Sequence, residues 1–122
     1  MNAKDDLQNM FEYHYALIRY VPDAIRMEPI NIGVILQGAG RIDFRLNTQA
    51  TFQRWREFFD EEIKCEAVPL FQPEKTSLQF FAHLQELCDK TVRVSRPLTV
   101  ACDIENFDQL LESLYSRLVA LP

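Results

Sequence analysis

The sequence contains few of the residues that break, cross-link or anchor a chain. Three glycines and six prolines in 122 residues exclude a low-complexity or fibrous protein. The three cysteines, Cys65, Cys88 and Cys102, are odd in number and widely spaced, and they form no C-x-x-C pair. We therefore expect reduced thiols, and neither a disulfide framework nor a structural zinc site. The longest apolar stretch, around Ile32–Leu36, is far shorter than the roughly 20 residues of a membrane helix.

Positive charge is also scarce. Thirteen Lys and Arg residues stand against 18 Asp and Glu residues, which gives a formal net charge of −5. Proteins that bind a phosphate backbone draw most of their affinity from cations, so this balance argues against nucleic acid as a partner. Residues Met1–Gln8 hold no apolar run, so we expect no signal peptide and no membrane contact. The expectation is a soluble cytoplasmic protein.

Apolar side chains, in contrast, are abundant enough to build a core. Hydrophobic residues make up 48% of the chain and include nine Phe, four Tyr and one Trp. A chain of this length hides roughly two-thirds of its unfolded surface on folding. We expect a single domain over residues 1–122, with the polar residues 1–9 frayed.

Four segments alternate apolar and polar residues with the period of a β-strand. They are residues 11–20, 30–37, 41–46 and 91–100. In the second segment, the even positions from 30 to 36 are all aliphatic, so we expect that side to face the core. The third segment is typical of a strand with one side in water. Pro97 cannot donate a ladder hydrogen bond, so the fourth segment is predicted to be an edge strand or extended chain.

Three further segments repeat their apolar residues at helical spacing. They are residues 49–63, 77–90 and 107–119. Asn106, followed three positions later by Gln109, resembles a capping box at the start of the last one. The order of elements lacks a regular β-α alternation. We therefore predict an α+β fold, with an antiparallel sheet of three to four strands and about three helices packed on one face.

No catalytic motif is evident. The only histidines, His14 and His83, are too few to argue for a Ser-His-Asp or Cys-His arrangement. There is no G-x-G-x-x-G pattern and no Walker lysine motif, and Gly38-Ala39-Gly40 is typical of a hairpin turn. The acidic run Asp60–Glu62 is typical of a solvated helix face. We therefore lean against an enzyme, and we expect no cofactor and no metal site.

Polar residues gather at the junction of the first two strands. They are Arg19, Asp23, Arg26, Glu28 and Asn31. We favour an ion-pair network of arginines and acids that fixes the crossover. The alternative is the wall of a ligand site, in which the arginines bind a phosphate or carboxylate and Glu28 acts as a general base. Gly33, within the second strand, indicates the close approach of another backbone.

The third strand and the first helix carry a local basic group of four arginines: Arg41, Arg45, Arg54 and Arg56. Such a patch can receive nucleic acid or an acidic partner. We favour ordinary surface pairing of these arginines with Asp43, Glu57 and Asp60.

The run from Tyr15 to Val34 resembles the opening of a family of short bacterial proteins, catalogued as domain of unknown function 3037. The residues that carry the resemblance are Arg-Tyr-Val-Pro-Asp from position 19, Arg26, Glu28, and Asn-Ile-Gly-Val from position 31. Residues 95–119 also resemble that family's C-terminal segment. Pro29 departs from the pattern, in which an aromatic or aliphatic residue is more common. The resemblance implies no reaction. It implies a partner or regulatory role, because members are often encoded beside kinase-like proteins similar to the HipA toxin.

These observations leave three functions open. The first is a small cytoplasmic, non-enzymatic accessory or regulatory protein that acts by protein–protein interaction, with a HipA-like kinase or a defence-related protein as partner. The alternative is a ligand-binding protein or enzyme with its site around Arg19, Arg26, Glu28 and Asn31. The second alternative is a nucleic-acid-binding module that uses the basic group.

Overall fold

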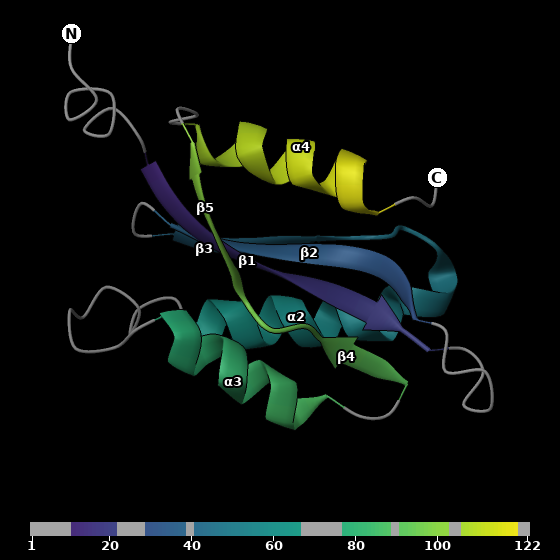
Figure 1. The fold of residues 1–122 in the computed structure, drawn as a ribbon. Helices are drawn as coiled ribbons and strands as arrows, with labels where there is room; N and C mark the ends of the chain where they lie inside the picture. Colours follow the sequence, from purple (N-terminus) through teal and green to yellow (C-terminus); the bar gives the residue numbers. More distant parts are fainter. Residues whose placement is uncertain are drawn as a thin grey trace, which may run out of the picture.

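The computed structural model describes residues 11–21, 29–38, 41–66, 77–88, 91–102 and 106–119. Its strands are β1 (Phe11–Tyr20), β2 (Ile30–Gly38), β3 (Arg41–Leu46), β4 (Val92–Val94) and β5 (Leu98–Cys102). Its helices are the short 3-10 helix η1 (Ala50–Phe52), α2 (Gln53–Glu66), α3 (Ser77–Leu87) and α4 (Phe107–Leu118). These bounds lie close to those expected from strand alternation and helical spacing (Figure 1).

The strands form one antiparallel sheet in which β3, β2 and β1 lie side by side. Two short strands share the outer side of β1. β4 pairs with its end, Ile18–Tyr20, and β5 with its beginning, Phe11–Tyr15. Pro97 falls between β4 and β5, where no ladder hydrogen bond is needed. The predicted edge segment 91–100 is therefore two edge strands interrupted at the proline.

β2 is buried on both of its faces. Ile32 and Ile35 belong to one core cluster, whereas Val34 and Leu36 belong to a second. All four side chains are fully buried. The expectation that the even positions of β2 form one aliphatic face is wrong, because a bulge opposite Ile18 and Arg19 shifts the register.

Helices cover the sheet from both sides (Figure 1). α2 and α3 contribute Phe59, Phe81 and Leu84 to the first cluster. α4 contributes Leu110 and Leu111 to the second. The α+β class, the antiparallel sheet and the three α-helices are confirmed. The helices do not share one face as expected, because a strand buried on both faces requires cover on both sides.

α4 begins where the sequence predicts. The side-chain oxygen of Asn106 accepts a hydrogen bond from the Gln109 N–H at 3.1 Å. This bond satisfies one of the free N–H groups of the first turn. At the other end, Arg117 lies in the last turn, where a cation interacts favourably with the helix dipole.

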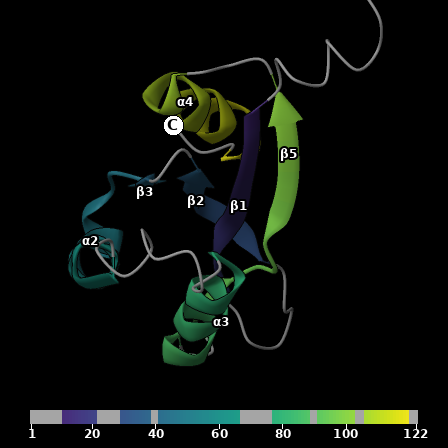
Figure 2. The ribbon, with the colours of Figure 1, turned by 90° about the vertical axis from the view of Figure 1, so that its left-hand side faces the viewer.

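α4 packs over β2 and β3, and its side chains also cover Tyr13 and Leu17 of β1. Ion pairs of Arg41 with Asp108 and of Arg45 with Glu112 join the helix to β3. Figure 2 shows α4 on the β2 side of β1, while β5 lies on the other side of β1. Among the described helices, none covers β5 on this face. On the opposite face of the sheet, Thr99 and Ala101 of β5 are exposed as well.

Candidate functional site

Two of the five candidate residues at the strand junction have a described place. Arg19 on β1 and Asn31 on β2 are partners in the β-ladder. Asp23, Arg26 and Glu28 lie outside the described residues. The structure therefore brings Arg19 and Asn31 together, and the proposed network with Arg26 and Glu28 stays a prediction.

Asn31 anchors the end of α4. Its side-chain N–H donates a hydrogen bond of 3.1 Å to the backbone oxygen of Leu118, the last residue of the helix. The last carbonyl groups of a helix have no partner within it. Asn31 supplies one, and this contact gives the residue a structural role.

A second arginine lies opposite Arg19 in the sheet. Arg93, at the centre of β4, lies directly across the ladder from it. Side chains alternate along a strand, and Tyr13 and Leu17 of β1 belong to the cluster under α4. Arg19 and Arg93 therefore point to the α4 side of the sheet. Like charges directly opposite each other destabilise a sheet.

A pocket of about 170 Å³ lies beside this arginine pair. Its lining residues are Arg19, Val21, Pro29, Arg93, Val94 and Ser95. None of these described lining residues is acidic, and no described acidic side chain forms an ion pair with either arginine. The Arg19 Nε atom is buried and has no hydrogen-bond partner. A buried donor left unpaired costs roughly 1–3 kcal/mol, so this arrangement needs a compensating partner.

Ser95 connects β4 to β5 and has no free polar group for chemistry. Its N–H donates to the Leu17 oxygen at 2.9 Å, and its hydroxyl accepts from the Leu17 N–H at 2.8 Å. The hydroxyl in turn donates to the Arg96 oxygen at 3.1 Å. The Ser95 carbonyl accepts from the Gln85 side chain at 2.9 Å. Ser95 thus continues the ladder between the two short strands.

Sequence reasoning missed Arg93 as a member of this site. The alternation of Val92, Arg93 and Val94 indicates a strand with the arginine on one side. Nothing in it indicates that this strand pairs with β1 opposite Arg19. The juxtaposition is a product of sheet topology, which local patterns do not specify.

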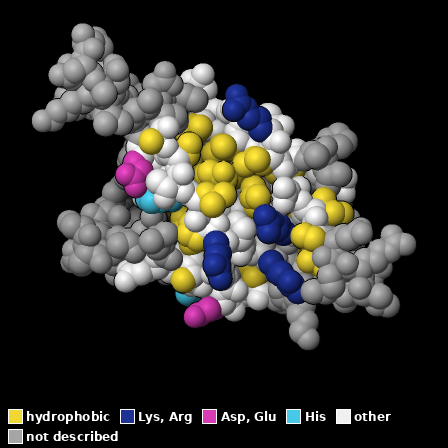
Figure 3. Space-filling model, in the orientation of Figure 1, with side chains coloured by type: hydrophobic (Ala, Val, Ile, Leu, Met, Phe, Trp, Pro, Cys, Tyr) yellow, Lys and Arg dark blue, Asp and Glu magenta, His cyan; other side chains and the backbone are white. Residues whose placement is uncertain are grey.

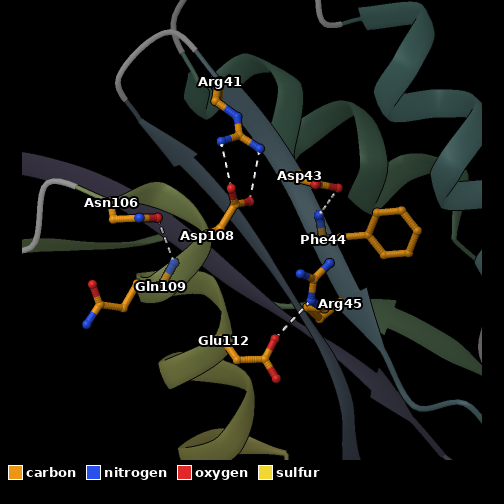
Figure 4. Close-up of polar contacts among 8 residues, drawn as sticks. All are labelled: Arg41, Asp43, Phe44, Arg45, Asn106, Asp108, Gln109 and Glu112. Carbon is orange, nitrogen blue, oxygen red and sulfur yellow. Dashed lines mark hydrogen bonds and ion pairs between the residues drawn. The ribbon is translucent and has the colours of Figure 1, made fainter.

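The basic group on β3 and α2 is divided among separate contacts, and Figure 4 shows those of Arg41 and Arg45. Arg41 forms two hydrogen bonds with the Asp108 carboxylate, at 3.1 and 3.3 Å. These bonds hold the pKa of Asp108 below its usual value. The Nε atom of Arg45 lies 3.2 Å from an oxygen of Glu112. Both acidic partners come from α4 rather than from the neighbouring residues that the sequence suggested.

The two arginines of α2 also have local partners. The guanidinium of Arg54 lies over the Trp55 ring, 5.7 Å from its centroid. Arg56 donates to the Asn47 oxygen at 2.6 Å and contacts the side chain of Gln53. A surface hollow of about 410 Å³ beside them is lined by Arg45 and Arg56 but also by Asp43, Glu57 and Asp60. Its charge is therefore mixed rather than positive.

An apolar strip follows the seam between α4 and β5. We name Tyr15, Leu98, Val100 and Leu114 the open strip. Leu98 is 51% exposed, and the other three are half-buried and pack against the cluster under α4. Leu98 and Tyr15 are ladder partners. Figure 3 shows hydrophobic side chains gathered on this face, with Lys and Arg side chains around them.

Metal and membrane features are absent from the described part of the chain. In those ranges no three His, Cys, Asp or Glu side chains converge in a way that could hold a metal ion. No helix in them has both the length and the apolar character needed to cross a bilayer.

Residues 15–74 match the family model described as Protein of unknown function (DUF3037). The chain therefore resembles this family over just under half of its length, from β1 to beyond α2. The matched stretch includes Arg19 and Asn31, whereas Arg93 and the segment 95–119 lie outside it. No curated protein and no solved structure matches the chain.

Proposed function

We propose that the chain is a small, non-enzymatic accessory protein that acts by binding another protein, which packs on the open strip. The observation that carries this proposal is the incomplete cover of the apolar side chains of β5 on the α4 face. Among the described helices α4 alone packs on this face, and it leaves Leu98 half exposed. Apolar side chains gathered at the surface commonly mark a contact with another macromolecule.

The expected occupant is an acidic, amphipathic helix of the partner, lying beside α4. Such a helix would complete the second layer with the same packing that α4 makes over β2 and β3. Charge supports an acidic partner, although the chain itself has a net charge of −5. Arg93 and Arg96 are exposed at the β4–β5 edge. Arg117 is exposed one turn along α4 from Leu114.

We place this function in the cytoplasm, and the bacterial family resemblance makes a HipA-like kinase the first partner to test. Cys88 forms no disulfide, which is consistent with a compartment in which thiols stay reduced. Nucleic-acid binding ranks lower among the proposals, because Arg41 and Arg45 already contact carboxylates.

The test compares two exposed leucines on opposite faces. Leu98→Asp places a charge in the open strip, whereas Leu87→Asp places one on α3, where Leu87 is 43% exposed. Each tagged variant and the wild type capture partners from the host, and affinities are then measured with the purified partner. We expect Leu98→Asp to weaken binding about tenfold or more, since a buried unpaired charge is costly. Leu87→Asp is expected to bind as the wild type does.

Three results would contradict the proposal. They are an equal loss of binding in both variants, no loss in either, and the capture of no stoichiometric partner. Size-exclusion chromatography tests whether the chain instead binds a second copy of itself. If the wild type is a dimer and Leu98→Asp is a monomer, a second copy of this chain occupies the strip, and the accessory role is overturned.

A further inference from the structure

We propose that the pocket between β1 and β4 binds a phosphate group through Arg19 and Arg93. This inference is independent of the open strip, and it concerns the protein alone, without a partner protein. Its starting point is the ladder that sets the two arginines directly opposite each other on one face. Two guanidinium groups in this position repel each other. An anion held between them attracts both, and these attractions outweigh the repulsion.

The pocket has room for a small polyatomic ion. Its volume is about 170 Å³, whereas one water molecule occupies about 30 Å³ in the liquid. Among the described residues that line it, the two arginines are the charged ones. Two cations, with no carboxylate among these described residues, favour a doubly charged oxyanion over a singly charged carboxylate.

A second observation points to a ligand at this place. The Nε–H of Arg19 is buried and unpaired, although buried donors are almost always satisfied. A guanidinium binds a phosphate in a two-pronged manner, through two parallel N–H donors. A turn of the Arg19 side chain toward a phosphate oxygen would give this donor a partner, and Arg93 would hold the same group from the other strand.

The apolar part of the wall adds to the effect. Val21, Pro29 and Val94 line the pocket beside the arginines. Apolar surroundings lower the local dielectric constant and strengthen each charge-assisted hydrogen bond. They also provide a surface for the organic part of a phosphomonoester. The shared chemistry is the phosphate group, and its source is either free phosphate or a phosphorylated small molecule.

The test is a thermal-unfolding titration of the full chain with inorganic phosphate, O-phosphoserine and acetate, each against sodium chloride of equal ionic strength. A ligand that binds the folded state alone raises the melting temperature, and the rise grows with the ratio of free ligand to its dissociation constant. We expect phosphate and O-phosphoserine to raise it and acetate to have little effect. A stronger effect of O-phosphoserine identifies a phosphomonoester as the ligand class, and a stronger effect of phosphate identifies the free ion.

Arg93→Gln and Arg96→Gln are the matched variants, because both side chains are exposed on the same edge and only Arg93 lines the pocket. We expect Arg93→Gln to weaken phosphate binding about tenfold or more, and Arg96→Gln to leave it unchanged. Equal weakening in both variants would reveal a general charge effect and overturn the site. So would the absence of a phosphate shift in the wild type. Since no partner protein is present, these outcomes do not depend on the open strip.

Discussion

At Gly33, the backbone of β2 lies close against β3. A Cβ atom built on Gly33 would lie 2.6 Å from the backbone oxygen of Arg45 and 2.8 Å from a methyl carbon of Leu46. Both residues belong to β3, and the carbonyl is part of the backbone, which has little freedom to move. The close approach predicted from a glycine within a strand is therefore confirmed.

Gly33→Ala is expected to lower the free energy of unfolding by about 1–3 kcal/mol, because the added methyl group overpacks the β2–β3 contact. The measurement is urea denaturation followed by circular dichroism. Thr51→Ala, at an exposed position of η1, is the control and should change the free energy little. An equal loss at both positions would show that the contact with Arg45 is not the cause.

The candidate site illustrates what residue patterns do and do not specify. Arg19 and Asn31 stand out in the sequence because polar residues gather at a strand junction. The sequence does not reveal their different roles, since Asn31 contacts the end of a helix that is distant in the sequence. Arg93 carries no local signal for its position opposite Arg19. Pairing between distant segments therefore decides which of these residues form a site.

At the scale of elements, α4 is attached to the sheet along its length. Arg41 contacts Asp108 in the first turn, Arg45 contacts Glu112 in the middle, and Asn31 contacts the carbonyl of Leu118 at the end. The polar contacts with β3 hold the helix near the β3 edge of the sheet. This offset leaves the opposite edge of the same face open.

The pair between Arg41 and Asp108 makes one part of this attachment sensitive to pH. The two hydrogen bonds lower the pKa of Asp108 in the folded state. Such a carboxyl stabilises the fold above its unfolded pKa, and the contribution is lost as the pH falls through the folded pKa. We expect Asp108→Asn to lower the urea midpoint slightly near pH 7 and to match the wild type near pH 2.

The control for this titration is Glu86→Gln, because Glu86 is an exposed carboxylate on α3. Its urea midpoint should follow that of the wild type at each pH. If the deficit of Asp108→Asn persists in acid, the asparagine itself disturbs the helix start, and the ion pair is not responsible.

The bounds of the elements follow from the sequence better than their placement does. Alternation and helical spacing locate each strand and helix, and Asn106 marks the start of α4. The face on which α4 packs depends on the bulge opposite Ile18 and Arg19, which transfers Val34 and Leu36 to the second cluster. A one-residue shift of register reverses every side chain beyond it, and simple alternation does not reveal it.

At the scale of the whole molecule, one sheet separates two cores that share β2. Leu84 of α3 is fully buried in the first core, and Leu111 of α4 is fully buried in the second. Trp55, the single tryptophan, packs against the first core. Since β2 contributes side chains to both cores, loss of packing on one side should weaken the other. The tryptophan therefore reports on the distant core if the molecule unfolds cooperatively.

Leu111→Ala is expected to lower the free energy of unfolding by about 2–5 kcal/mol, as is usual when a buried leucine is truncated. The decisive readout is whether Trp55 fluorescence and far-ultraviolet circular dichroism shift by the same amount. Coincident shifts indicate that both cores unfold together through β2. Leu98→Ala, at an exposed position of β5, is the control and should leave both transitions nearly unchanged. A dichroism transition that moves while the Trp55 transition stays in place would mean that α4 detaches from an otherwise intact sheet.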